Sequence, residues 1–163
     1  MDAEKKQTYT RRIAASNKSE LIVILYEIFF DYVAEAYEGY AGGKHGDEDS
    51  RAAIYHANDV LTHLIADLNF EPACRELSRS LFSIYHFCQR QLFDTLFLER
   101  DAGLREAEKL MRELYGSFKE AAKQDTSAPL MQNTQSTVAG YTYGRNDVTE
   151  MGTDLNPSRG FLA

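Results

Sequence analysis

The sequence predicts an all-α protein: an antiparallel four-helix bundle with an N-terminal cap segment and an irregular C-terminal tail. Between residues 18 and 124, four segments carry apolar residues spaced alternately by three and four, which is helical periodicity. Short breaks rich in Gly, Asn, Pro or Asp separate these segments, and short connections favour antiparallel neighbours. We therefore expect a cap arm (1–17), a bundle (18–124) and a polar, flexible tail (125–163).

The first two bundle helices are predicted from their apolar stripes and from the breaks that follow them. The first spans about residues 18–38 and precedes a glycine-rich loop at 42–46. The second spans about residues 49–68 and ends at Asn69. Their stripes are Leu21, Leu25, Ile28 and Tyr32 in the first helix, and Ile54, Ala57, Leu61, Leu64 and Leu68 in the second.

The last two bundle helices are marked by the residues at their starts. Pro72 is expected in the first turn of the third helix, which continues to about residue 100. Asp101 is a plausible N-cap for the fourth, which continues to about residue 124. Their stripes are Leu77, Leu81, Ile84, Cys88 and Leu92 in the third helix, and Leu104, Ala107, Met111, Leu114, Phe118 and Ala121 in the fourth.

The two ends of the chain differ from this body. The arm carries more basic than acidic side chains, and Tyr9 and Ile13 are four residues apart, so both fall on one helical face that would cover the bundle as a removable lid. The alternative is an ordinary frayed terminus. The tail is rich in Thr, Ser, Asn and Gly and cannot build its own core, although residues 138–143 and 161–162 would allow it to fold back into a groove.

Composition and charge exclude several classes of protein. Hydrophobic residues make up 44% and charged residues 26%, as in ordinary globular chains. A net charge of -7 disfavours binding to nucleic acid or to anionic lipid, since both need a basic surface. The longest apolar stretch, residues 21–33, is too short and too charged to span a membrane, and the N-terminus lacks the layout of a secretory signal. We expect a cytoplasmic protein without direct membrane insertion.

Two helices carry more apolar surface than a bundle needs. Of the 13 residues in 21–33, 11 are apolar, and Glu27 and Asp31 are the only polar ones. On the third helix, Phe82, Phe93 and Phe97 fall on the side opposite the main stripe. These second faces either pack inside a slightly oversized bundle or form exposed grooves that bind an amphipathic helix of a partner.

The sequence gives no support to catalysis or to a bound metal or cofactor. Its four histidines lie outside any zinc or di-iron motif. No glycine-rich phosphate loop is present, and no motif places a base beside a serine or cysteine. We therefore expect no catalytic residues, no metal and no cofactor.

Several stretches between Thr8 and Lys123 resemble the FliS family of flagellin export chaperones in order and spacing. They are Ala15-Ser16, Glu20-Leu21 and Ile24-Leu25-Tyr26 near the start; Leu68-Asn69-Phe70-Glu71 at the second junction; and Glu76-Leu77, Leu81, Ile84-Tyr85, Phe87, Arg90 and Leu92 on the third helix. The chain departs from the family pattern at Asn17-Lys18, which stand near the place of a proline, at Cys74-Arg75 in place of Gly-Gly, and at Gln91 in place of an arginine. An Asn or Ser cap is expected instead of the proline.

The resemblance implies a cytosolic chaperone that holds the C-terminal helical region of flagellin in outer grooves, prevents premature polymerisation and delivers the subunit to the flagellar export gate. The N-terminal arm would be a displaceable cap, with Tyr9 and Ile13 as its anchors. As client-binding groove residues we predict Tyr26, Phe29, Phe82, Tyr85 and Phe93. The rival hypothesis is a non-catalytic helical-bundle adaptor or a self-associating structural protein, and homodimerisation stays open.

Overall fold

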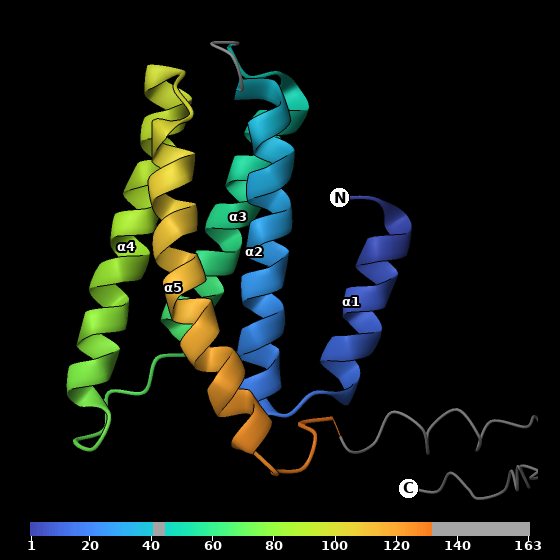
Figure 1. Cartoon of the computed structure of the whole chain (residues 1–163), viewed down its shortest axis with the longest axis vertical. Helices are drawn as coiled ribbons and strands as arrows, with labels where there is room; N and C mark the ends of the chain where they lie inside the picture. Colours follow the sequence, from blue (N-terminus) through green and yellow to red (C-terminus); the bar gives the residue numbers. More distant parts are fainter. Residues whose placement is uncertain (41–44, 132–163) are drawn as a thin grey trace, which may run out of the picture. The chain divides into compact units, whose positions relative to one another are not determined.

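The computed structural model describes residues 1–40 and 45–131, which contain five α-helices and no strand (Figure 1). The all-α prediction is therefore confirmed. The greater part of the predicted tail, residues 132–163, lies outside the described residues, as does most of the predicted glycine-rich loop. The helices are α1 (Ala3–Ala15), α2 (Lys18–Tyr40), α3 (Glu48–Ala66), α4 (Arg75–Leu98) and α5 (Ala102–Gln124).

Helices α2 to α5 pack around a common interior. α2 contacts α3 and α5, and α4 also contacts α3 and α5, so each of the four has two helical neighbours. Consecutive helices of this group run in opposite directions (Figure 1). α1 is outside the group and packs on α2.

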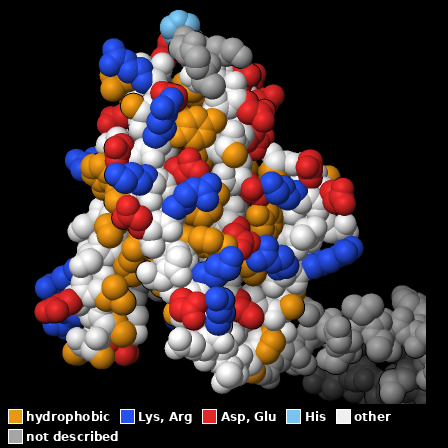
Figure 2. Space-filling view, viewed as in Figure 1, with side chains coloured by type: hydrophobic (Ala, Val, Ile, Leu, Met, Phe, Trp, Pro, Cys, Tyr) orange, Lys and Arg blue, Asp and Glu red, His pale blue; other side chains and the backbone are white. Residues whose placement is uncertain are grey.

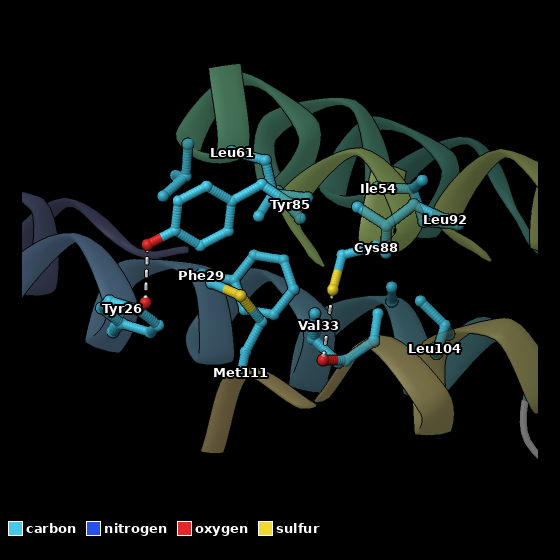
Figure 3. Packing of buried hydrophobic residues seen from close by; sticks show 14 of the residues in the cluster. Tyr26, Phe29, Val33, Ile54, Leu61, Tyr85, Cys88, Leu92, Leu104 and Met111 are labelled. Carbon is cyan, nitrogen blue, oxygen red and sulfur yellow. Dashed lines mark hydrogen bonds between the residues drawn. The ribbon is translucent and has the colours of Figure 1, made fainter. Parts of the chain in front are cut away.

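The interior follows the predicted stripes most closely in α3 and α5. On α2 the predicted stripe of Leu21, Leu25, Ile28 and Tyr32 is only half-buried, and Tyr26, Phe29 and Val33 fill the interior instead. On α4, Leu77 of the predicted stripe is 62% exposed. Figure 3 shows Tyr26 and Tyr85 facing each other, and their hydroxyl groups share a hydrogen bond of 2.8 Å. The thiol of Cys88 points at the backbone carbonyl of Ala107. The largest fully buried side chains are Tyr26, Tyr40, Tyr85, Phe29, Ile54, Leu61, Leu92, Leu104, Met111, Val33, Thr95 and Cys88.

Helix ends follow local capping chemistry, with two departures from expectation. Asn17 caps α2: its side-chain oxygen accepts from the Glu20 N–H (2.8 Å), and Glu20 accepts from the Asn17 N–H (3.0 Å), which is a reciprocal capping box. Pro72 lies in the turn before α4 rather than in its first turn. Asp101 precedes α5 as expected, but its carboxylate pairs with Arg105 and makes no capping hydrogen bond.

Gly103 allows α4 and α5 to approach closely. A Cβ atom at this position would lie 2.0 Å from the Gln91 carbonyl oxygen and 2.7 Å from Thr95 Oγ1. Any side chain would therefore force the two helices apart.

Candidate functional site: the α1-covered face and the outer face of α4

The sequence makes α1 a helix with defined ends. Asp2 caps it by accepting a hydrogen bond from the Lys5 N–H (2.7 Å), and Ser16 ends it with its hydroxyl on the Ile13 carbonyl (2.9 Å). α1 runs beside α2 in the opposite direction (Figure 1). Tyr9 is buried against the rest of the chain and Ile13 is half-buried, so the two predicted anchors lie on the covered side of α1.

Polar contacts along α2 hold α1 in place. The Tyr9 hydroxyl donates to Asp31 Oδ2 (2.7 Å), and Lys5 Nζ lies 2.7 Å from Asp31 Oδ1. Arg12 Nη1 lies 2.6 Å from Glu27 Oε2. The hydrogen bond to Glu27 raises the pKa of Arg12, while burial and the Asp31 carboxylate raise the pKa of Tyr9. Both α1 side chains therefore keep their protons at neutral pH.

Glu27 also connects α1 to the face that α2 shares with α5. Its Oε1 atom accepts a hydrogen bond from the Tyr115 hydroxyl of α5 (2.9 Å). On that face the Tyr115 ring packs edge-on against Phe30, and the Arg112 guanidinium lies 4.5 Å from the Phe30 ring centroid. Figure 2 shows acidic and basic side chains interleaved with hydrophobic ones over α2 and α5. The apolar surplus of α2 is thus covered partly by α1 and partly by α5.

The segment after α5 touches the junction between α1 and α2. The Leu130 N–H donates to the Ser16 carbonyl (3.0 Å), and the Asn17 side-chain amide donates to the Asp125 carbonyl (3.2 Å). The Ser19 hydroxyl donates to the Asp125 carboxylate. Residues 125–130, which we call the clasp, therefore lie against the junction between α1 and α2, which we call the hinge.

A pocket of about 410 Å³ opens where α1 ends, beside the start of α2 and the end of α5. Its lining combines small or apolar residues with charged ones. The lining residues are Ala15, Ser16, Val23, Ile24 and Ala122, together with Arg12, Glu20, Lys119 and Lys123. A pocket of this composition can take an apolar side chain.

The outer face of α4 carries exposed aromatic side chains. Phe82 is 40% exposed and Phe97 is 83% exposed, while Phe93 is half-buried and lines a depression with Phe97. The Phe82 ring also contacts His86, with ring centroids 4.3 Å apart. These side chains lie opposite the buried stripe of α4, where its periodicity placed them, and they leave apolar area open to a partner.

Three predicted groove residues are not on a surface. Tyr26 and Phe29 have no exposed area, and Tyr85 is 1% exposed. The hydroxyl groups of Tyr26 and Tyr85 are hydrogen-bonded to each other, so both rings pack in the interior without leaving a buried polar atom unpaired. Their assignment to a client groove was wrong for this conformation, and they belong to the core.

The described residues hold no group of three or more His, Cys, Asp or Glu side chains that could bind a metal. The two histidine–carboxylate contacts, His45 with Glu99 and His56 with Asp59, lie on the surface rather than in a pocket. Within the same ranges, no helix combines the length and the hydropathy that a bilayer crossing requires. The candidate site is made of helix surfaces that can contact another helix.

Comparison with known protein families decides the family. The family model described as flagellar protein FliS matches residues 1–125, which include all five helices. The chain belongs to the FliS family. No match was found among curated proteins. FliS proteins are flagellar proteins known as export chaperones that bind flagellin, and the family is not catalytic.

Two structural features of this FliS protein were missed from the sequence. Glu27 and Asp31 of α2 pair with Lys5, Tyr9 and Arg12 of the arm, and the clasp reaches back to the α1–α2 hinge. The first had a signal: two acidic residues, four apart in an otherwise apolar run, face a basic arm that carries cations and an aromatic ring. The second had no signal, since its contacts, one backbone hydrogen bond and several through the side chains of Asn17 and Ser19, join residues far apart in the sequence.

Proposed function

We propose that this protein is a cytoplasmic flagellar export chaperone that binds the C-terminal helical region of flagellin. Helices α2 to α5 form its antiparallel four-helix bundle, and α1 is a displaceable cap anchored by Tyr9 and Ile13. Binding prevents premature polymerisation, and the subunit then passes to the flagellar type III export apparatus. The bundle and its cap are the functional domain, and the tail is an appendage.

One observation carries this proposal: α1 covers an apolar helix but contacts α2 alone among the helices. A segment attached through one neighbour and a short hinge is a low-stability unit that can open without unfolding the bundle. Its removal would expose the covered side of α2, next to the pocket at the end of α5. The outer face of α4, with Phe82, Phe93 and Phe97, offers further apolar surface.

The energetics suit an unfolded client. A disordered segment that folds on binding buries about 1,000–3,000 Å² and loses a few kcal/mol to ordering. The burial of extended apolar surfaces offsets that cost without any chemical reaction. While α1 occupies part of the surface, only chains in which α1 is displaced can bind the client there. The apparent affinity for the client is therefore reduced in proportion to the fraction of such chains, and the client competes with α1. Release therefore requires no nucleotide on this chain.

Titration calorimetry with the C-terminal region of flagellin from the same organism tests the proposal. We expect a 1:1 complex and weaker binding by Phe93→Asp. The control Tyr55→Asp, which replaces an exposed aromatic ring of α3 with the same charge, should bind as the wild type does. Circular dichroism should show that both variants stay helical. A chain that does not bind this region, or equal affinity for Phe93→Asp and wild type, would count against the proposed client or the proposed surface, respectively.

The arm is tested in the same assay. A chain lacking residues 1–13 should bind the client at least as tightly as the full chain if α1 is a competing lid. Weaker binding would instead make α1 part of the binding surface.

A second candidate function is self-association through the exposed face of α4. The observation that favours it is the exposure of Phe97 and Leu98 at the end of that helix. Sedimentation of the chain alone distinguishes the two: a concentration-dependent dimer lost in Phe97→Asp supports self-association, and a monomer at all concentrations supports the chaperone.

A further inference from the structure

Three carboxylates of α2 meet the N-terminal arm: Glu35 pairs with the terminal ammonium group of Met1, and Glu27 and Asp31 lie under α1 itself. Glu27 and Asp31 are one helical turn apart, and with α1 in place their side chains are 24% and 22% exposed. Both oxygens of each carboxylate have a partner within 3 Å. The two charges are therefore well satisfied although the surface around them is largely apolar.

Three of these four partners belong to α1 and follow a simple spacing. Lys5 and Tyr9 meet Asp31, and Arg12 meets Glu27. Taken along α1, a cation, an aromatic hydroxyl and a second cation stand at positions i, i+4 and i+7, on one side of a helix. The fourth partner, Tyr115, is part of α5 and stays when α1 leaves.

A helix that replaced α1 would cover the same two carboxylates. Covering a charge without pairing it is costly, because the group loses water and gains nothing in return. An incoming helix with a purely apolar face would match the neighbouring side chains but would leave Asp31 with no donor and Glu27 with Tyr115 alone. The surface thus favours occupants that bring their own donors at the right spacing.

We propose that Glu27 and Asp31 make this face of α2 a selective docking track for a client helix that presents basic and hydroxyl side chains at i, i+4 and i+7, as α1 does. The identity of that helix as a flagellin segment rests on the proposed function; the chemistry of the track does not. Charge complementarity is the argument for this occupant, since the resident helix is basic on the side that faces the two acids.

The test uses the full chain with its own arm weakened by Lys5→Ala, Tyr9→Ala and Arg12→Ala, and a labelled synthetic peptide of residues 2–16 as the probe. Fluorescence anisotropy should show saturable binding of the peptide. Adding Glu27→Gln and Asp31→Asn should weaken it about tenfold or more. The matched control, Glu106→Gln with Glu113→Gln, removes the same two charges from exposed positions on α5 and should leave binding unchanged.

Two further measurements identify the source of the effect. Binding should weaken as sodium chloride rises from about 0.05 to 0.5 M, because the ion pairs are partly exposed. A peptide with Arg12→Glu should bind poorly to the arm-weakened chain and recover on the same chain carrying Glu27→Arg. Peptide affinity that is unchanged by Glu27→Gln and Asp31→Asn, or the absence of saturable binding, would contradict the proposed docking track.

Repeating the titration with the flagellin C-terminal region separates the two proposals. Flagellin binding that falls with Glu27→Gln and Asp31→Asn supports both. Flagellin binding that ignores them overturns the track as a client site while the chaperone proposal stands. If flagellin fails to bind and the peptide binds through the carboxylates, the chaperone proposal fails and the track remains, with α1 of a second copy as its occupant.

Discussion

At the scale of single residues, the core is organised around a pair of tyrosines. Burial raises the pKa of both Tyr26 and Tyr85, so both phenols stay protonated, and each hydroxyl has the other as its hydrogen-bond partner. A buried hydroxyl without a partner is costly, whereas removing both hydroxyls together leaves no orphan. The pair therefore ties α2 to α4 through chemistry that depends on both members.

Tyr26→Phe should lower the free energy of unfolding by about 1–3 kcal/mol, because it leaves the Tyr85 hydroxyl unpaired. Urea denaturation followed by circular dichroism measures the change. The double variant Tyr26→Phe/Tyr85→Phe should lose less than the sum of the two single variants. Additive losses would show that the two hydroxyls do not interact.

A second prediction at this scale concerns Asp125 in the clasp. Hydrogen bonds from Ser127 and Ser19 lower the pKa of its carboxyl from 3.8 to about 2. Because the pKa is lower in the folded chain, the stabilisation from this group is complete above its ordinary value and is lost as the pH falls through about 2. Carbon-detected NMR titration should show the low midpoint, and Ser19→Ala should raise it. A wild-type midpoint at 3.8 would contradict the contacts of the clasp.

At the scale of helices, amphipathic periodicity could be predicted well and spatial partners could not. The stripes of α3 and α5 identify their cores because each helix has one apolar face. α2 is apolar nearly all round, so its sequence does not say which side is interior, and Tyr26 and Phe29 were misplaced for that reason. Pro72 was misplaced because a proline suits a turn as well as a first helical turn.

The close crossing of α4 and α5 gives a prediction at the same scale. Gly103→Ala should lower the free energy of unfolding by about 1–3 kcal/mol, because the new methyl group would collide with the Gln91 carbonyl. Gly116→Ala is the matched control in the same helix, where a Cβ meets nothing within 4 Å. It should raise stability by about 0.5–1 kcal/mol through better helix propensity. Thermal unfolding of both variants measures the contrast, and a neutral Gly103→Ala would contradict the crossing.

At the scale of the whole molecule, the arm, the hinge and the clasp form one connected system. α1 docks on α2 through Glu27 and Asp31, while the clasp contacts Ser16 and Asn17 at the hinge. Opposite charges on the arm and on residues 27 and 31 are a sequence hint of the pairing of α1 with α2, whereas the return of the clasp leaves no such hint, because it joins segments far apart in the sequence. The exposed rings of α4, in contrast, follow from helical spacing alone. On the proposed function, chaperone activity would be an exchange of one docked helix for another.

Hydrogen exchange with mass spectrometry on the full chain, with and without the flagellin C-terminal region, tests this exchange most directly. If the client displaces the arm, the amides of α1 should exchange faster in the complex, while those of α2 around residues 27–31 stay protected and the outer face of α4 gains protection. Unchanged or slower exchange of α1 in a saturated complex would contradict the displacement of the arm.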